Sequence, residues 1–137
     1  MNDKDLVNLV KFLGKHFNTF DPFRIAEKLN IDIQYRPFDE KPLGDTIDFF
    51  GRPIILLADS LKYSNQRYFV CAHELGHAIE HADMQAYYVS SKFASTHYEV
   101  QADKFAVSLL GQFYMEEHGH VPDNWMDLVH TYGYPSL

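Results

Sequence analysis

The segment His73-Glu74-Leu75-Gly76-His77 constrains this chain more than any other part of it. Two histidines four residues apart lie on one face of an α-helix, about one turn from each other. Both imidazoles can then reach a single metal ion. Glu74 projects to the side, where a water on that metal would lie. This is the arrangement of a zinc site with its own general base. The alternative is an amphipathic helix that carries two histidines and no metal.

A second motif runs from Glu99 to Asp103. A catalytic Zn²⁺ takes three protein ligands and keeps one open position, and two histidines with one glutamate are a known ligand set. We therefore expect Glu99 to be the third ligand. Asp103 follows on the same helical face, where its carboxylate can accept a hydrogen bond from the outer nitrogen of a zinc-bound histidine and orient the ring. The alternative is a pair of solvated carboxylates on an exposed helix.

The two segments Phe69–His81 and Glu99–Leu110 together resemble the ImmA/IrrE family of zinc metallopeptidases. The resemblance covers roughly Asp21 to Leu137, and the zinc arrangement is similar to that of thermolysin. It implies a single small zincin-like metallopeptidase domain of the α+β class. Family members occur in bacteria, mobile elements and phages and are associated with cutting or inactivating helix-turn-helix repressors. The resemblance thus implies a phage or mobile-element anti-repressor whose partner is such a repressor.

Carried over position by position, the resemblance makes His73, His77 and Glu99 the zinc ligands and Glu74 the catalytic residue. The family often has Asn where Asp103 stands, and either side chain can orient a histidine. It also often has a proline shortly after the paired leucines, where this chain continues with glycine and glutamine. That departure concerns the end of the helix and leaves the metal site unaffected.

The length and charge of the chain limit the functions that it can have. A chain of 137 residues is expected to form one domain spanning 1–137. Its 12 basic and 19 acidic residues give a formal net charge of −7. A phosphate backbone would mostly be repelled, so we expect no direct binding to nucleic acid. The acidic balance suits a basic protein partner.

The single cysteine, Cys71, excludes an intramolecular disulfide. The chain begins without a signal peptide and contains no apolar run long enough to span a bilayer, so we expect a cytoplasmic protein without membrane contact. Cys71 lies at the wrong angle to share the face of His73. We interpret it as a small buried core residue rather than a ligand or nucleophile.

The first half of the chain predicts two helices in residues 1–30 and strands in residues 31–58. Apolar residues at helical spacing predict a helix over 3–17, and Asp21-Pro22 predicts the start of a second one. We expect this helix pair to have a packing role in the fold. The alternative is a helix-turn-helix that reads DNA. The expected strands are Ile31–Tyr35, Thr46–Phe50 and Ile54–Ala58, the last two forming a hairpin in which a proline limits pairing near the turn. We expect a short antiparallel or mixed sheet packed against the helices.

The second half is expected to be helical. The histidine motif lies in a helix over residues 60–82, capped by Ser60 or Ser64, and a loop follows over 83–94. Thr96 and Glu99 fit a capping box, so a helix over 95–112 begins near Thr96 and has Glu99 in its first turn. A last helix, over 122–132, begins at a proline and stops at Gly133.

Three further residues can line the cleft or stabilise an oxyanion. His81 lies four residues after His77 and shares its face, with a ligand role as the alternative. His97 and Tyr98 lie beside Glu99, where either side chain can stabilise the negative charge on a polarised carbonyl. Ordinary surface or core placement is the alternative for both. The pair His118 and His120 is expected to be a loop pair rather than a metal site.

These observations predict a zinc-dependent endopeptidase in which Glu74 accepts the proton of the attacking water and passes it to the leaving amine. By analogy with related zinc proteases, the strand around Ile54–Ala58 is expected to offer an edge to an extended substrate. The activity of the predicted endopeptidase can depend on a partner protein. Two alternatives remain open at this stage. One is an anti-repressor that sequesters a regulator around a structural zinc without cutting it, and the other is a toxin–antitoxin component.

Overall fold

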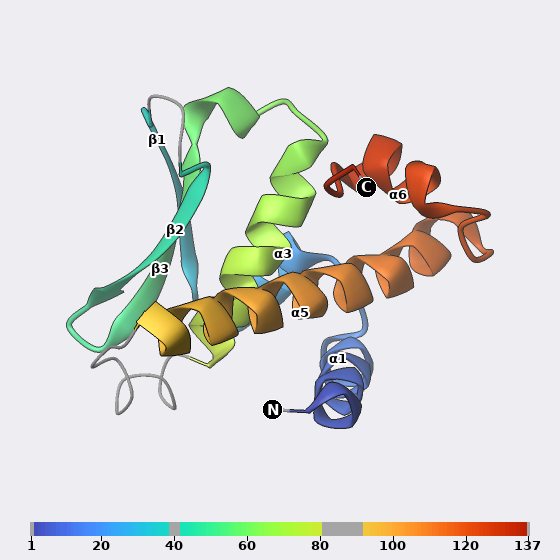
Figure 1. Ribbon diagram of the computed structural model, residues 1–137, viewed down its shortest axis with the longest axis horizontal. Helices are drawn as coiled ribbons and strands as arrows, with labels where there is room; N and C mark the ends of the chain where they lie inside the picture. Colours follow the sequence, from blue (N-terminus) through green and yellow to red (C-terminus); the bar gives the residue numbers. More distant parts are fainter. Residues whose placement is uncertain (1, 39–41, 81–91, 137) are drawn as a thin grey trace.

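The computed structural model describes residues 2–38, 42–80 and 92–136 and has an α+β architecture, with one small sheet beside a group of helices (Figure 1). The elements in chain order are α1 (Asp3–Phe17), α2 (Pro22–Lys28), β1 (Asp32–Arg36), β2 (Gly44–Phe49), β3 (Arg52–Ala58), the 3₁₀ helix η1 (Asp59–Leu61), α3 (Gln66–Ile79), α5 (Lys92–His118) and α6 (Trp125–Tyr132). Helix α3 packs against the sheet, and α5 crosses α3 on the side away from it. The predicted fold class is confirmed.

The sheet is mixed, with the strand order β1-β3-β2. β1 pairs with β3 in parallel and β2 pairs with β3 in antiparallel fashion. Because β3 has a neighbour on each side, its backbone groups are already paired. The prediction that Ile54–Ala58 offers a free edge is therefore wrong. The edges of the described sheet belong to β1 and β2.

The hairpin between β2 and β3 turns at Phe50 and Gly51, whose φ angles of 53° and 85° are both positive. Two consecutive positive φ values are typical of a type I′ turn, and glycine adopts this conformation without steric cost. Pairing continues up to Phe49 opposite Arg52. The expectation that Pro53 limits pairing near the turn is therefore wrong. The parallel ladder with β1 begins only at Ile54, so Pro53 lies outside it.

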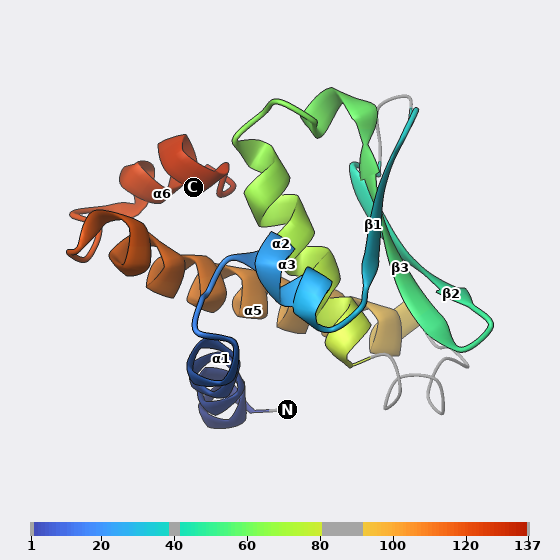
Figure 2. The same cartoon turned by 180° about the vertical axis from the view of Figure 1, so that it is seen from behind.

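The two N-terminal helices form as predicted. The Asn2 side chain caps α1 by accepting a hydrogen bond from the backbone nitrogen of Asp5 at 2.8 Å. The Asp21 side chain caps α2. Both helices bury their apolar faces, including Val10 of α1 and Ile25 of α2. Figure 2 shows α2 lying over α3, close to the sheet.

Helix α3 begins at Gln66, later than the predicted residue 60. The preceding residues first form η1 and a turn, in which the side chain of Leu61 is buried. The hydroxyl of Ser64 accepts a hydrogen bond from the backbone nitrogen of Gln66 at 3.1 Å. Of the two predicted caps, Ser64 lies next to the observed start of the helix, whose N-cap is Asn65, and Ser60 lies in η1. The C-cap of α3 is Glu80, and the predicted end at Ala82 lies outside the described residues.

Helix α5 spans Lys92–His118, longer than the predicted 95–112. It runs through Thr96, so the predicted start near Thr96 is wrong, and Glu99 does not lie in the first turn. Residues 92–94, predicted as loop, are helical. The C-terminal extension follows from tertiary contacts: the Glu116 carboxylate accepts hydrogen bonds from the Thr19 hydroxyl at 2.9 Å and from the Phe20 backbone nitrogen at 2.7 Å.

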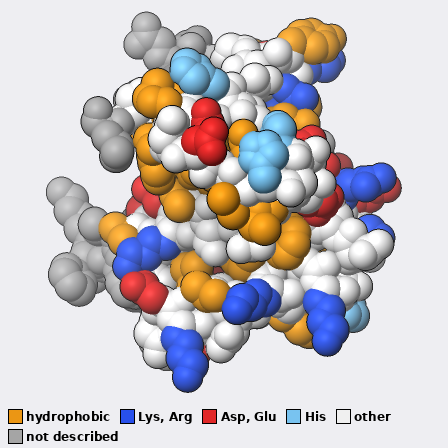
Figure 3. All heavy atoms as spheres, turned by 90° about the vertical axis from the view of Figure 1, so that its right-hand side faces the viewer, with side chains coloured by type: hydrophobic (Ala, Val, Ile, Leu, Met, Phe, Trp, Pro, Cys, Tyr) orange, Lys and Arg blue, Asp and Glu red, His pale blue; other side chains and the backbone are white. Residues whose placement is uncertain are grey.

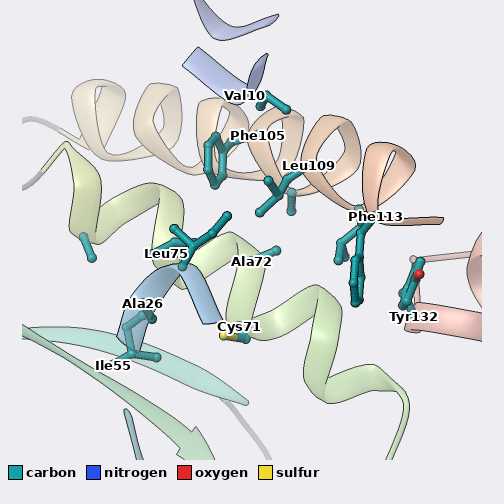
Figure 4. Packing of buried hydrophobic residues seen from close by; sticks show 14 of the residues in the cluster. Val10, Ala26, Ile55, Cys71, Ala72, Leu75, Phe105, Leu109, Phe113 and Tyr132 are labelled. Carbon is teal, nitrogen blue, oxygen red and sulfur yellow. The ribbon is translucent and has the colours of Figure 1, made fainter. Parts of the chain in front are cut away.

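The core lies where α3 meets α5 and the sheet. Figure 4 shows Phe105 and Leu109 of α5 pointing toward Leu75 and Ala72 of α3. These side chains are almost fully buried, and burying a large apolar side chain stabilises a fold by about 1.5–3 kcal/mol. Gly76 permits the close approach of the helices, because a Cβ there would lie 3.1 Å from the Phe105 ring.

Helix α6 closes the opposite end of α5, where Tyr132 stacks on Phe113 with ring centroids 5.5 Å apart. The helix begins at Trp125 rather than at the predicted residue 122, because the side chain of Asn124 caps it. Gly133 ends it with a φ of 74°, as predicted. On the face in Figure 3, lysine and arginine side chains lie scattered among acidic and hydrophobic groups. Within the described residues, no helix combines the length and apolar character needed to cross a membrane.

Candidate metal centre

The packing of α5 on α3 brings three predicted ligands together. His73 and His77 lie on successive turns of α3, and Glu99 lies on α5. The His73 Nε2 atom is 3.2 Å from Glu99 Oε2, and the His77 Nε2 atom is 2.7 Å from Glu99 Oε1. The donor atoms of all three residues lie within 4.8 Å of one another. Two imidazole nitrogens and a carboxylate oxygen at this spacing form a group that can hold one cation.

The donor set fits Zn²⁺ in number and chemistry. Zinc binds histidine nitrogen and carboxylate oxygen at about 2.0–2.2 Å in tetrahedral geometry, so two ligand atoms on one ion lie about 3.3–3.6 Å apart. Only small side-chain adjustments separate the observed positions from such a geometry. The histidine side chains are 14% and 13% exposed and that of Glu99 is 57% exposed. The group is therefore accessible from the Glu99 side, as a site that must admit a substrate requires.

Asp103 orients His73. Its Oδ1 atom is 2.7 Å from the Nδ1 atom of His73, one helical turn from Glu99. An ionised carboxylate only accepts hydrogen bonds, so Nδ1 of His73 is the donor. The lone pair of the neutral ring is then on Nε2, the atom that points toward Glu99. Asp103 thereby selects the tautomer that a metal ligand needs.

Burial favours the neutral form of the His77 imidazole. Burial lowers its pKa from the ordinary 6.5, with the Glu99 carboxylate opposing that effect and the nearby His73 adding to it. Desolvation disfavours the charged imidazolium. The neutral ring, which carries the free lone pair, is therefore favoured at neutral pH.

Glu74 is buried at the side of this group, with 7% of the residue exposed. Its Oε2 atom lies 3.9 Å from His73 Nε2. Desolvation raises the pKa of Glu74 from 4.5 to about 7, against the lowering effects of a hydrogen bond from Thr46 and the charge of His73. A carboxyl that titrates near neutrality can both accept and return a proton, which is the property of a general acid–base residue.

Thr46 was missed in the sequence analysis. This residue of β2 donates from its hydroxyl to Glu74 Oε1 at 2.8 Å. It is 28 positions away from Glu74 in the sequence, and no local motif marks it. Strand alternation groups Thr46 with Asp48, opposite the apolar Ile47 and Phe49, and would have placed Thr46 toward solvent. In the structure Ile47 and Phe49 are exposed, and the packing of β2 against α3 makes Glu74 the neighbour of Thr46.

The comparison with protein families agrees with this geometry. A family model described as "Peptidase_M78: IrrE N-terminal-like domain" matches residues 26–110. The chain belongs to this family. The match includes the sheet, α3 and the part of α5 that carries Glu99 and Asp103, while α1 and α6 lie outside it.

The ImmA/IrrE resemblance predicted from the sequence is thereby confirmed. A relative in Bacillus phage phi105, named "Uncharacterized immunity region protein 2", is 31% identical over 103 residues. The alignment covers 74% of this chain and 65% of the relative, so the chain matches slightly less than two thirds of that protein's length. No solved structure matches the chain significantly.

The other predicted site residues that the structure describes do not belong to the cluster of His73, His77 and Glu99. His81 and the side chain of His97 lie outside the described residues. Tyr98 is half-buried on α5. His118 stacks on Tyr114 with ring centroids 4.0 Å apart, at the far end of α5 from Glu99.

Cys71 is fully buried, and burial raises the pKa of its thiol well above the ordinary value. The thiolate, which is the nucleophilic form of cysteine, is therefore strongly disfavoured. The prediction of a small core residue is confirmed.

Proposed function

We propose that this chain is a zinc-dependent endopeptidase. The observation that carries the proposal is the convergence of His73, His77 and Glu99 within 4.8 Å, beside a buried glutamate whose Oε2 atom is 3.9 Å from His73 Nε2. A structural zinc site closes all four positions with protein and has no use for a base. Membership of a family described as a peptidase supports the same reaction.

In this proposal His73, His77 and Glu99 hold Zn²⁺. When bound there, the ion would polarise a scissile carbonyl and lower the pKa of water toward about 7. Asp103 keeps the Nε2 lone pair of His73 available by accepting a hydrogen bond at Nδ1. Glu74 takes the proton from the attacking water through its carboxylate and then gives that proton to the leaving amine.

The substrate would lie along β2. This strand is an edge of the described sheet, and its Thr46 contacts Glu74. An extended peptide can add to a free strand edge through backbone hydrogen bonds, with pockets for alternate side chains. We therefore assign to β2 the role that the sequence analysis gave to β3.

A helix-turn-helix transcription repressor is the proposed substrate. The support is the family resemblance together with the immunity-region name of the phage relative. The net charge of −7 would favour a basic partner and disfavour direct contact with nucleic acid. The chain would thus act as an anti-repressor by removing a regulator.

The test is to incubate the zinc-loaded protein with helix-turn-helix repressors from the genome that encodes it, and to analyse the products by gel and mass spectrometry. We expect defined fragments with the wild type, and none with Glu74→Gln or after chelation. Metal analysis of the variant should still find zinc, because Glu74 is not among the three proposed ligands. Equal cleavage by Glu74→Gln would contradict the assigned base.

The same experiment separates the two alternatives. A stoichiometric complex of intact proteins would favour an anti-repressor that acts by sequestration, since its zinc would serve only the fold. A complex in which the partner blocks the activity of this chain would favour a toxin–antitoxin component, provided that the activity returns when the partner dissociates.

A further inference from the structure

Glu74 has two carboxylate oxygens with different surroundings. The Oε1 atom accepts a hydrogen bond from the Thr46 hydroxyl at 2.8 Å. The Oε2 atom points to the cluster of proposed ligands and lies 3.9 Å from His73 Nε2. Thr46 of β2 therefore binds Oε1, while Oε2 faces the position that a reacting water would occupy in the proposed mechanism.

The Thr46 hydroxyl carries a single proton, and two acceptors of Glu74 lie within reach. The carboxylate Oε1 atom is at 2.8 Å and the backbone carbonyl oxygen at 3.1 Å. Hydrogen bonds to an ionised acceptor are shorter and about twice as strong as those between neutral groups. The proton is therefore directed to Oε1 whenever the carboxylate is charged.

The close approach of β2 to α3 makes this contact possible. A Cβ atom at Gly44 would lie 2.5 Å from Val70 Cγ1 and 3.1 Å from Glu74 Cγ. Only a residue without a side chain fits between the strand and the helix at this point. The glycine two positions before Thr46 thus sets the distance at which the hydroxyl meets the carboxylate.

We propose that Thr46 is a positioning residue that holds the Glu74 carboxylate by Oε1 and so presents Oε2 to the reacting water. The inference rests on the proposed function and extends it to a residue outside both helical motifs. Thr46 acts through Glu74. Its contribution is to remove rotational freedom from a buried carboxylate that must accept a proton in one direction.

A purely structural role for Thr46 makes a different prediction. The hydroxyl would then only tie β2 to α3, and its removal would weaken the fold without a specific effect on turnover. The control is Thr19→Val, because Thr19 is also buried and donates from its hydroxyl to a glutamate, at 2.9 Å from Glu116 Oε2, in the region where α5 meets the α1–α2 connection.

The experiment compares Thr46→Val, which keeps the shape and removes the hydroxyl, with Thr46→Ser, which keeps the hydroxyl. The proteins are loaded with zinc, and the substrate is the intact repressor that the wild type cleaves. Thr46→Val should lower kcat by about 10- to 100-fold, as expected for the loss of one hydrogen bond to a charged group. KM and zinc affinity should stay within about threefold in this comparison. Thr46→Ser should retain kcat within about threefold, and Thr19→Val should retain it while lowering Tm.

Crystal structures of the metal-loaded variants give a readout that does not depend on turnover. We expect Glu74 to keep its orientation in Thr46→Ser and to rotate or occupy several orientations in Thr46→Val. The proposal is overturned if Glu74 is unmoved in Thr46→Val, if kcat is unchanged, or if the serine variant loses as much kcat as the valine variant. A wild type without any cleavage would instead overturn the proposed function, and the crystal structures would then decide the role of Thr46 by themselves.

Discussion

The Nδ1 atom of His73 donates a hydrogen bond to Asp103 Oδ1 at 2.7 Å, across the packed helices α3 and α5. The same aspartate lies four residues after Glu99, so one face of α5 supplies both a proposed ligand and the group that orients another ligand. In the proposed metal site this hydrogen bond would hold the ring of His73 before the cation binds, which would reduce the entropic cost of binding.

Removing this hydrogen bond should weaken metal binding without abolishing it. Asp103→Ala frees the ring of His73 to rotate and to change tautomer, so we expect the zinc affinity to fall by about 10- to 100-fold. Competition with a chromophoric chelator measures the change. Asp103→Asn keeps an acceptor oxygen and should lose much less. Equal affinities of the alanine variant and the wild type would contradict the orienting role.

Loss of a proposed ligand should have a larger effect. We expect His77→Ala to bind almost no zinc after dialysis, as measured by elemental analysis of the purified protein. Zinc should raise the Tm of the wild type and EDTA should reverse that gain, because a ligand that binds only the folded state stabilises it. The control is His118→Ala, since His118 packs on Tyr114 away from the cluster. This variant should keep its zinc.

The pH dependence of stability should carry a signature of Glu74. Its folded pKa is raised from 4.5 to about 7 by burial, so the fold favours the protonated carboxyl. The stabilisation from this group is fully present below pH 4.5 and is lost as pH rises through about 7, at a cost of roughly 3–4 kcal/mol. In metal-free protein, Glu74→Gln should lack this loss, because glutamine does not titrate.

Urea unfolding in the presence of a chelator, at pH values from 4.5 to 8, measures that difference. The free energy of unfolding of the wild type, minus that of Glu74→Gln, should fall across this range. His77 contributes with the opposite sign, because burial lowers its pKa, but its effect is common to both proteins and cancels. A difference that is constant with pH would show that Glu74 titrates as an exposed carboxyl does.

Gly44→Ala should damage the site through packing. The added Cβ would lie 2.5 Å from Val70 Cγ1, so β2 must move away from α3 and carry the Thr46 hydroxyl with it. We expect a loss of about 1–3 kcal/mol in stability, as for other overpacked sites, together with a lower kcat. Gly111→Ala is the control. A Cβ there meets nothing within 4 Å, and alanine in a helix interior should stabilise by about 0.5–1 kcal/mol.

Gly133→Ala should destabilise the protein without touching the metal centre. Gly133 has a φ of 74°, and a Cβ there would lie 2.4 Å from the Cα atom of Gln66. Both the conformation and the contact exclude a side chain where α6 ends against the start of α3. We expect a loss of more than about 1 kcal/mol, measured by thermal unfolding. Zinc affinity at a temperature where the variant is folded should match that of the wild type.

Most helices and the hairpin could be predicted because their signals are local. The caps Asp21 and Gly133 act within a few residues of their own helix ends, as do the apolar positions of α1. The errors came from distant contacts. Helix α5 extends past residue 112 to His118 where Glu116 binds the connection between α1 and α2, a contact between residues 97 positions apart.

The sequence by itself determined the family and the spacing that places His73 and His77 on one face of a helix, because the period of an α-helix is fixed by its backbone hydrogen bonds. The tertiary structure decided which groups meet that face. It brought Glu99 and Asp103 to the histidines, made β3 the central strand, and placed Thr46 on the carboxylate of Glu74. These relationships depend on how helices and strands pack against one another, and the local pattern of a single chain does not specify that packing.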